Sequence, residues 1–401
     1  MVFMYNYFML RDPKKSISDI VTQQAEILWD ISINLFNNPE IAFQEYKACQ
    51  TLCEYLKNNG YSVETPIGGL DTAFRASLGS GDFPTIAILA EYDALVGLGH
   101  ACGHNLIAAS AVGAAMALAN ISPKVPGTVQ VIGTPAEEGG GGKILLINAG
   151  IFKHVDAALM FHPASKNMVL RTSLASSRMK VEFYGKASHA AAAPEEGINA
   201  LDAMILTFNN IHALRPTLTP MDTIAGVIKN GGEASNIIPA YTCAEFSIRS
   251  LTTNRRDELI EKVRACAKAG ALAVGCKVNC VVTPGYSQMI PNRILAGLFK
   301  SNLESLGLAV EDPSPFERMG STDMGDVSHI IPAIHPYLAI APEIVAGHTL
   351  EFKDYVFSET GKTAMLNAAK ALAMTVCDLL TNTDLLHKAR EELTEAQLGS
   401  S

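Results

Sequence analysis

The sequence lacks the features that define several classes of protein. It contains no run of lysine and arginine, and its net charge is −9, so we expect no nucleic-acid partner. Charged residues make up only 18% of the chain and hydrophobic residues 48%, which is typical of a soluble globular protein rather than a disordered one. Because 401 residues are too many for one ordinary core, we predict two domains.

Long hydrophobic runs are also missing. The first ten residues, MVFMYNYFML, are apolar but too few to span a bilayer. Charged residues follow this run instead of preceding it, unlike the order in a signal peptide. We therefore expect no membrane partner and a cytoplasmic protein.

Cysteine is too scarce for a disulfide scaffold, with eight in the whole chain. The pairs Cys49/Cys53 and Cys276/Cys280 lack the companion ligands of a zinc ribbon or finger. We interpret every cysteine except Cys102 as a reduced and mostly buried thiol.

Three short apolar runs predict strands that are buried on both faces: TIAILAEY (85–92), GTVQVIGT (127–134) and VDAALMFH (155–162). A helix of small residues at 105–119 separates the first two, and residues 16–60 have a helical pattern. This alternation predicts an α/β domain with a mostly parallel sheet.

The pattern changes near residue 178, where RMKVEFYG alternates as a half-exposed strand does. From there the chain has the order βαββαβ, which predicts an inserted ferredoxin-like domain. The strands are expected at 178–185, 223–232, 240–250 and 277–286, and the helices at 197–214 and 254–275.

We therefore predict an α/β domain in two parts, 16–175 and 289–390, with the inserted domain at 176–288 between them. A long helix is expected at roughly 357–383. The polar tail from about 391 is expected to fray.

The heptad GHACGHN (99–105) places Cys102 and His104 two residues apart. In an extended segment their side chains would point to the same side. Thiolate and imidazole are both good ligands for zinc-type ions, although a pair alone does not make a site. The alternative for this heptad is a buried thiol near the start of a helix.

Further polar side chains follow the same three predicted strands. Glu91 and Asp93 come after the first strand with the heptad, the pair Glu137-Glu138 follows the second, and His162 ends the third. The carboxyl ends of parallel strands meet at one edge of a sheet, where open α/β sheets bind their ligands. This convergence predicts a metal site there.

Glu137 and Glu138 are adjacent in a turn, so their side chains point to different sides and can take two different tasks. One can bind a metal ion while the other takes the proton of a metal-bound water. The alternative is a pair of exposed turn glutamates. Asp93 suits a carboxylate that orients a ligand, and His348 in AGHTLEF is the best candidate for a fifth ligand.

Six motifs together resemble the aminoacylase/carboxypeptidase family of dinuclear metallopeptidases. Its branch of hippurate and indoleacetyl-amino-acid hydrolases is similar, and aminobenzoyl-glutamate hydrolases and β-alanyl-lysine dipeptidase-like enzymes are most similar. The motifs appear in the family's order over about 30–385: AEYDALVGLGHACGHN, GTPAEEGGGG, FHP, GKASHAAAAPEEGINAL, EASNIIPA and GHTLEF.

The resemblance implies two divalent metal ions, zinc or manganese with cobalt as a further choice, held by Cys102, His104, Glu138, His162 and His348. It implies Glu137 as the general base, the parts 16–175 and 289–390 as the catalytic metal-binding domain, and the inserted domain as a lid and dimerisation domain. It also implies a homodimer in which each inserted domain lends His189 to stabilise the oxyanion in the partner's site. Asn236 and Arg249 match the positions that contact substrate, the latter as a carboxylate clamp.

One position departs from the family. The aminoacylases have a metal-binding histidine two residues before the equivalent of Asp93, where this chain has Glu91. The hippurate-type branch usually has aspartate there, so we expect the ligand set to depend on Cys102 and His104, without Glu91.

We therefore expect a metallohydrolase that cleaves the amide bond of a small N-acyl amino acid or dipeptide. Two alternatives remain open. One is a biosynthetic enzyme of the same fold that acts on a specialised amide or in the amide-forming direction. The other is a thiol or metal-storage protein centred on Cys102, in which Glu137 would have no role.

Overall fold

The computed structural model describes residues 12–79, 83–121, 124, 126–314, 317 and 319–399. The apolar segment at residues 1–10 lies outside this range. The described residues form two compact units, one within 1–171, 290–317 and 326–401 and the other within 172–289 and 318–325. The second unit therefore interrupts the first in sequence.

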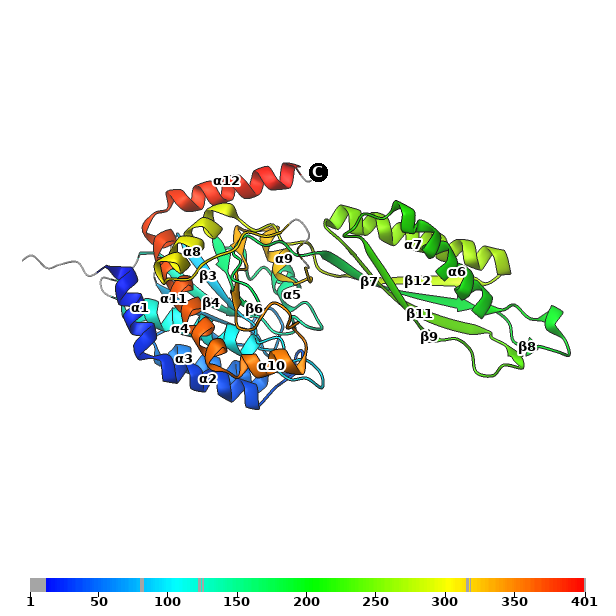
Figure 1. Ribbon diagram of the computed structural model, residues 1–401, viewed down its shortest axis with the longest axis horizontal. Helices are drawn as coiled ribbons and strands as arrows, with labels where there is room; N and C mark the ends of the chain where they lie inside the picture. The colour runs from blue at the N-terminus through cyan, green and yellow to red at the C-terminus, as the bar shows by residue number, and fades with distance from the viewer. Residues whose placement is uncertain are drawn as a thin grey trace, which may run out of the picture. The chain divides into compact units, whose positions relative to one another are not determined.

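A six-stranded sheet forms the centre of the first unit, with the order β1-β2-β4-β3-β5-β13 (Figure 1). Strands β4, β3, β5 and β13 are parallel to one another, and β1 and β2 add an antiparallel edge. The mostly parallel sheet is thus confirmed. The strands are β1 Ser62–Glu64, β2 Phe74–Gly79, β3 Thr85–Ala90, β4 Thr128–Gly133, β5 Ala157–Leu159 and β13 Ala333–Ile334.

The third predicted strand, 155–162, is divided in the structure. β5 ends at Leu159, and His162 begins a separate strand, β6 (His162–Ala164), which pairs in parallel with β14 (Tyr337–Ala339). Apolar residues continue through Met160 and Phe161, so hydropathy alone could not reveal the change of partner.

Helix α4 (His104–Asn120) is buried along almost its whole length and packs against α2 (Ala25–Asn37) and α11 (Glu359–Thr381). Its small residues allow this close approach: a Cβ at Gly113 would lie 2.7 Å from Leu28 Cδ1. The unit's other helices are α1 Pro13–Gln23, α3 Tyr46–Asn58, α5 Gly142–Asn148, α8 Arg293–Ser305 and α10 Leu350–Val356, and α9, Met324–Ser328, straddles the border between the units.

Among the described residues, α11 alone is long and apolar enough to cross a membrane. In its most apolar window, 72% of the residues are buried inside the structure. Its composition is therefore explained by its place in the core of the first unit.

The prediction of a frayed tail was wrong. Helix α12 (Asp384–Gly399) continues past residue 391, with Leu386 and Leu393 buried. The Glu392 carboxylate accepts hydrogen bonds from the backbone N–H groups of Arg293 and Ile294 at the start of α8. The polar composition of this segment did not reveal that one face of α12 is apolar and that its Glu392 carboxylate caps α8.

The second unit is built on an antiparallel sheet with the order β12-β7-β11-β9, which is the ferredoxin-like arrangement predicted from sequence (Figure 1). Helices α6 and α7 pack on this sheet, and a short ladder joins β8 to β10. The elements are β7 Ala175–Tyr184, β8 Ser188–His189, α6 Ala200–Leu214, β9 Thr223–Asn230, β10 Ile237–Ile238, β11 Tyr241–Ser250, α7 Thr253–Val274 and β12 Lys277–Thr283.

Phe246 on β11 is a central residue of this second core. Its side chain is 2% exposed, its ring centroid lies 5.1 Å from that of Phe208, and Gly226 leaves room for its edge. Replacing Phe246 by alanine should lower the free energy of unfolding by about 3–5 kcal/mol. Chemical denaturation measures this loss.

Leu272 on α7 provides the control, because it is 86% exposed in the same unit. Leu272→Ala should change stability by no more than about 0.5 kcal/mol. Equal losses from the two variants would show that Phe246 does not anchor the core.

Candidate metal centre

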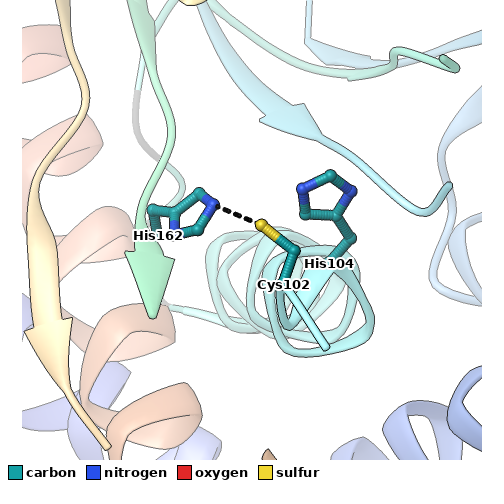
Figure 2. A group of neighbouring side chains, drawn as sticks. All are labelled: Cys102, His104 and His162. Atoms are coloured by element: carbon teal, nitrogen blue, oxygen red, sulfur yellow. Dashed lines mark hydrogen bonds between the residues drawn. The ribbon is translucent and has the colours of Figure 1, made fainter. Parts of the chain in front are cut away.

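Cys102 and His104 come together through a turn and not, as expected, through an extended segment. His104 is the first residue of α4, and Gly103 before it has a φ of 84°. This left-handed conformation suits glycine, and a Cβ at Gly103 would lie 2.5 Å from Pro163 Cγ. The turn brings ligand atoms of Cys102, His104 and His162 within 4.8 Å of one another (Figure 2).

Both histidines are held with Nε2 directed into this group. His104 Nδ1 lies 3.0 Å from Asp93 Oδ1 and 2.9 Å from the Asp93 carbonyl oxygen, and both of these atoms are acceptors. His162 Nδ1 likewise donates to the Pro163 carbonyl at 2.7 Å, while its Nε2 lies 3.4 Å from Cys102 Sγ. Because Nδ1 carries the hydrogen in each ring, the Nε2 lone pair can bind a cation.

Glu138 and His348 form a second group with the same thiol. His348 Nε2 lies 3.3 Å from Cys102 Sγ and 3.3 Å from Glu138 Oε1. The His348 side chain is 52% exposed, and its backbone N–H donates to the carbonyl of Ala101, which ties the segment to the Cys102 turn. Cys102 therefore lies between two sets of candidate ligands.

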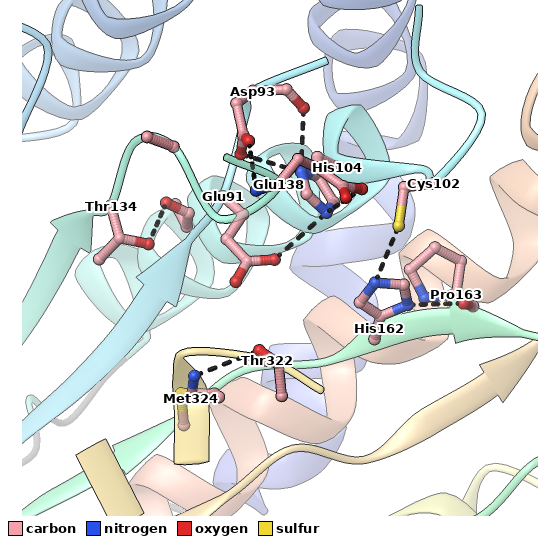
Figure 3. Close-up of polar contacts among 12 residues, drawn as sticks. Glu91, Asp93, Cys102, His104, Thr134, Glu138, His162, Pro163, Thr322 and Met324 are labelled. Carbon is pink, nitrogen blue, oxygen red and sulfur yellow. Dashed lines mark hydrogen bonds and ion pairs between the residues drawn. The ribbon is translucent and has the colours of Figure 1, made fainter. Parts of the chain in front are cut away.

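Asp93 connects these groups. Besides contacting His104 through Oδ1, it accepts the backbone N–H of Glu138 on Oδ2 at 2.9 Å (Figure 3). Burial alone would raise the pKa of the Asp93 carboxyl, but in the metal-free protein the charge of a protonated His104 and these hydrogen bonds outweigh burial and lower it. Asp93 is therefore an ionised carboxylate that orients a ligand.

The side chains fit a metal ion. Within the described part of the chain, His104 Nε2 and Glu138 Oε1 are buried and make no hydrogen bond, although they lie 3.9 Å apart and each has a further ligand-type atom within 3.5 Å. Buried polar atoms that converge without hydrogen bonds are costly unless a cation lies among them. Thiolate, imidazole and carboxylate are also the donor set of zinc-class ions.

Burial also sets the protonation of the outer ligands. It lowers the pKa of His162 to about 4, helped by the charge on His104, so His162 is a neutral ligand at pH 7. It raises the pKa of the Cys102 thiol, which a bound cation would counter by stabilising the thiolate.

Glu137 lies in the same region as Glu138. One carboxylate oxygen from each residue lies within 4.8 Å of the other and of His104. The Glu137 side chain is buried, at 9% exposure. The alternative of two exposed turn glutamates does not describe this arrangement.

A buried ion pair beside this centre was not predicted. Lys143 Nζ, on α5, lies 2.5 Å from Glu91 Oε1, and Glu91 Oε2 lies 3.5 Å from His104 Nε2. Both side chains of the pair are at most 1% exposed. The sequence signal was a lysine directly after GGGG, at the start of an otherwise apolar helix, which needs a buried counter-charge.

His335 is a second residue that sequence reasoning missed. It is 2% exposed, and its ring centroid lies 5.4 Å from that of His162 and 5.0 Å from that of Tyr337. Burial lowers its pKa well below the usual value, so it is a neutral ring that packs beside His162. It follows the β13 strand, as His162 follows β5.

The remaining predicted residues lie in the second unit. His189 and Asn236 are exposed neighbours, joined by the hydrogen bond from Ala190 N to the Asn236 carbonyl. Arg249 lies near the end of β11, and its Nη1 donates to Ser321 Oγ at 3.4 Å. β11 is ten residues long; Asn236 comes just before its first residue and Arg249 is its ninth. Arg249 therefore lies at the opposite end of this unit from His189 and Asn236.

Comparison with protein families finds a peptidase dimerisation domain over residues 174–274, within the second unit. The Xaa-Arg dipeptidase of Mus musculus is 39% identical over 96% of this chain and 94% of its own. A p-aminobenzoyl-glutamate hydrolase chain of Escherichia coli is 28% identical over 94% of each chain.

Solved structures share the fold. A putative aminohydrolase from methicillin-resistant Staphylococcus aureus matches with a TM-score of 0.78 and 22% identity, over 92% of this chain and all of the other. A dinuclear metal-binding peptidase of the M20 family from Bacillus subtilis matches with a TM-score of 0.69 and 20% identity, over 89% and 99% of the chains.

The Lys143–Glu91 pair makes a stability prediction. Lys143→Met leaves the Glu91 carboxylate buried without this counter-charge and should cost about 3–5 kcal/mol of unfolding free energy in metal-free protein. Adding Glu91→Gln to the same protein removes the buried carboxylate that lacks its counter-charge, so most of the lost unfolding free energy should be recovered. Chemical denaturation of the wild type, Lys143→Met and the double variant tests this, and a double variant no more stable than Lys143→Met would contradict it.

Proposed function

The chain belongs to the M20 family of peptidases, and on that premise we propose that it is a metal-dependent amidohydrolase that cleaves a small N-acyl amino acid or dipeptide. The observation that carries the proposal is the pair of ligand groups that share Cys102 beside the buried Glu137. Dipeptides with a C-terminal arginine are the first substrates to test, because Xaa-Arg dipeptidases align with nearly the whole chain.

We assign two divalent ions to these groups, zinc or manganese, with cobalt as a further choice. Cys102, His104 and His162 would hold one, and Cys102, Glu138 and His348 the other. The thiolate favours zinc. Bound there, the metal supplies an acidified water and a polarised substrate carbonyl.

Glu137 acts as the general base. Its carboxylate takes a proton from the attacking water and returns it to the departing amine. Its burial and its place beside His104 and Glu138 support this role. Asp93 contributes by fixing the ring of His104 and the backbone of Glu138.

His189 stabilises the oxyanion. Its Nδ1 accepts the backbone N–H groups of Ala191 and Ala192, each at 3.2 Å, so the ring hydrogen is on Nε2. A neutral Nε2–H on an exposed side chain can donate to the developing negative charge. Asn236 provides a polar contact beside it, and Arg249 binds a substrate carboxylate.

We propose a homodimer in which His189 of one chain serves the partner's metal centre. The exposed position of His189, the matched dimerisation domain and the edge strand β9, with Val227 and Ile228 exposed, support this arrangement. We also propose a cytoplasmic location, since all eight cysteines are free thiols.

Glu137→Gln separates this function from its alternatives. The amide cannot accept the water proton, so kcat should fall by about 10²–10⁴-fold, while the metal-to-protein ratio stays that of the wild type. Cys102→Ser is the matched variant and should lose metal and activity together. Assays with Xaa-Arg dipeptides and metal analysis measure both effects.

Full hydrolysis by Glu137→Gln would exclude the proposed mechanism and favour chemistry at the Cys102 thiol. A wild-type protein that joins the two products faster than it cleaves the dipeptide would favour the amide-forming alternative.

Subunit mixing tests the homodimer. Glu137→Gln and His189→Ala are each expected to be inactive, but a mixed dimer has one site with both wild-type groups. After random exchange about half of the dimers are mixed, each with one working site of two, so activity should recover to roughly a quarter of the wild type. No recovery after mass spectrometry has shown exchange would mean that His189 does not act across chains.

A further inference from the structure

The backbone just before Glu137 has an unusual conformation. Ala136 has a φ of 60°, in the left-handed region that residues with a Cβ seldom adopt. Such a conformation persists only where the surroundings hold it. The orientation of Glu137 therefore depends on what holds Ala136.

The Glu45 carboxylate holds the N–H of Ala136, while the Ala136 carbonyl accepts the backbone N–H groups of Gly140 and Gly141 within the turn. Glu45 Oε1 accepts the backbone N–H of Ala136 at 2.9 Å and that of Phe43 at 3.0 Å, and Phe43 is itself left-handed with a φ of 61°. Its Oε2 accepts the Thr72 hydroxyl at 2.8 Å. Glu45 is fully buried, and it precedes α3, far from Ala136 in sequence.

The other side of Glu137 is held in the same way. Asp93 Oδ2 accepts the N–H of Glu138 at 2.9 Å (Figure 3). Buried carboxylates thus bind the peptide N–H groups of both residues that flank Glu137. Asp93 also contacts His104, whereas the described hydrogen bonds of the Glu45 side chain go to the turn, to Phe43 and to Thr72.

We propose that Glu45 is a positioning residue that holds the Ala136 turn and thereby aims the Glu137 carboxylate. The proposal rests on the proposed function of Glu137. Without the Glu45 acceptor, Ala136 can relax toward a negative φ, which rotates the next peptide and moves Glu137 away from the water. Ligand side chains elsewhere keep their places, so metal binding should persist.

The role needs the Oε1 acceptor and not the charge. Burial raises the pKa of Glu45 to about 7, so both protonation states are populated near neutral pH. In the protonated form the Oε2 hydroxyl can donate to Thr72 Oγ1, and Oε1 still accepts both backbone N–H groups. A glutamine amide has the same pattern, so Glu45→Gln should rescue what Glu45→Ala loses.

The experiment compares Glu45→Ala and Glu45→Gln with Leu56→Ala, a fully buried residue of α3 that does not contact the turn through hydrogen bonds. Glu45→Ala should lower kcat at least about 30-fold, with KM and the metal-to-protein ratio within about twofold of wild type. Glu45→Gln should stay within about threefold of the wild-type kcat, and Leu56→Ala should lower thermal stability without this loss.

Hydrogen exchange of the peptide that contains residues 135–141 gives a readout independent of activity. Its amides should exchange faster in Glu45→Ala than in Leu56→Ala, and at the wild-type rate in Glu45→Gln. If Glu45→Ala does not fold, Glu45→Leu replaces it with the same expected results, because leucine fills the buried space but offers no acceptor to the Ala136 and Phe43 N–H groups.

Wild-type kcat in Glu45→Ala, an equal loss in Leu56→Ala, or a loss in Glu45→Gln as large as in Glu45→Ala would each overturn the proposal. Failure of the proposed function has a different result: Glu137→Gln would remain active. In that case the exchange rates still decide whether Glu45 holds the turn.

Discussion

The two hydrogen bonds of the Asp93 carboxylate hold the candidate centre together. One oxygen contacts His104 Nδ1 at 3.0 Å, and the other accepts the Glu138 N–H at 2.9 Å. These contacts join the end of β3 to the start of α4 and to the turn after β4. Because Asp93 can only accept when ionised, it fixes which nitrogen of His104 carries the hydrogen and leaves Nε2 for a cation.

Charge balance follows from this arrangement. Under the proposed function, Cys102, Asp93, Glu137 and Glu138 carry four negative charges in a largely buried region, and two divalent ions supply four positive charges. Glu91 and Lys143 cancel one another beside them. A buried site with so many like charges is costly unless cations occupy it, which is the physical reason that the side chains suit a dinuclear centre.

The sequence predicted the parts of the fold that can be recognised from the spacing of apolar residues and from polar residues at the ends of strands. Both sheets, the inserted ferredoxin-like order and the proximity of Cys102, His104, Glu138 and His162 followed from the positions of apolar runs. His348 was a weaker candidate from sequence, because its loop has no periodic pattern, and the family resemblance strengthened it.

Backbone conformation and pairing between distant residues could not be predicted. The left-handed turn at Gly103, the change of sheet after Leu159 and the anchored α12 all depend on tertiary contacts. The contact of Glu45 with Ala136 and the ion pair of Glu91 with Lys143 could not be predicted either, because in each pair the two residues lie far apart in the sequence. The structure supplied these two pairs, and both support residues next to the centre.

X-ray absorption spectroscopy of the metal-loaded protein tests the central claim, a metal centre in which Cys102 is a shared ligand, most directly. Loaded with zinc, the wild type should show one sulfur at about 2.3 Å from each ion, together with nitrogen and oxygen ligands at about 2.0–2.2 Å. A spectrum with only nitrogen and oxygen neighbours, in protein shown to carry two ions per chain, would contradict the account.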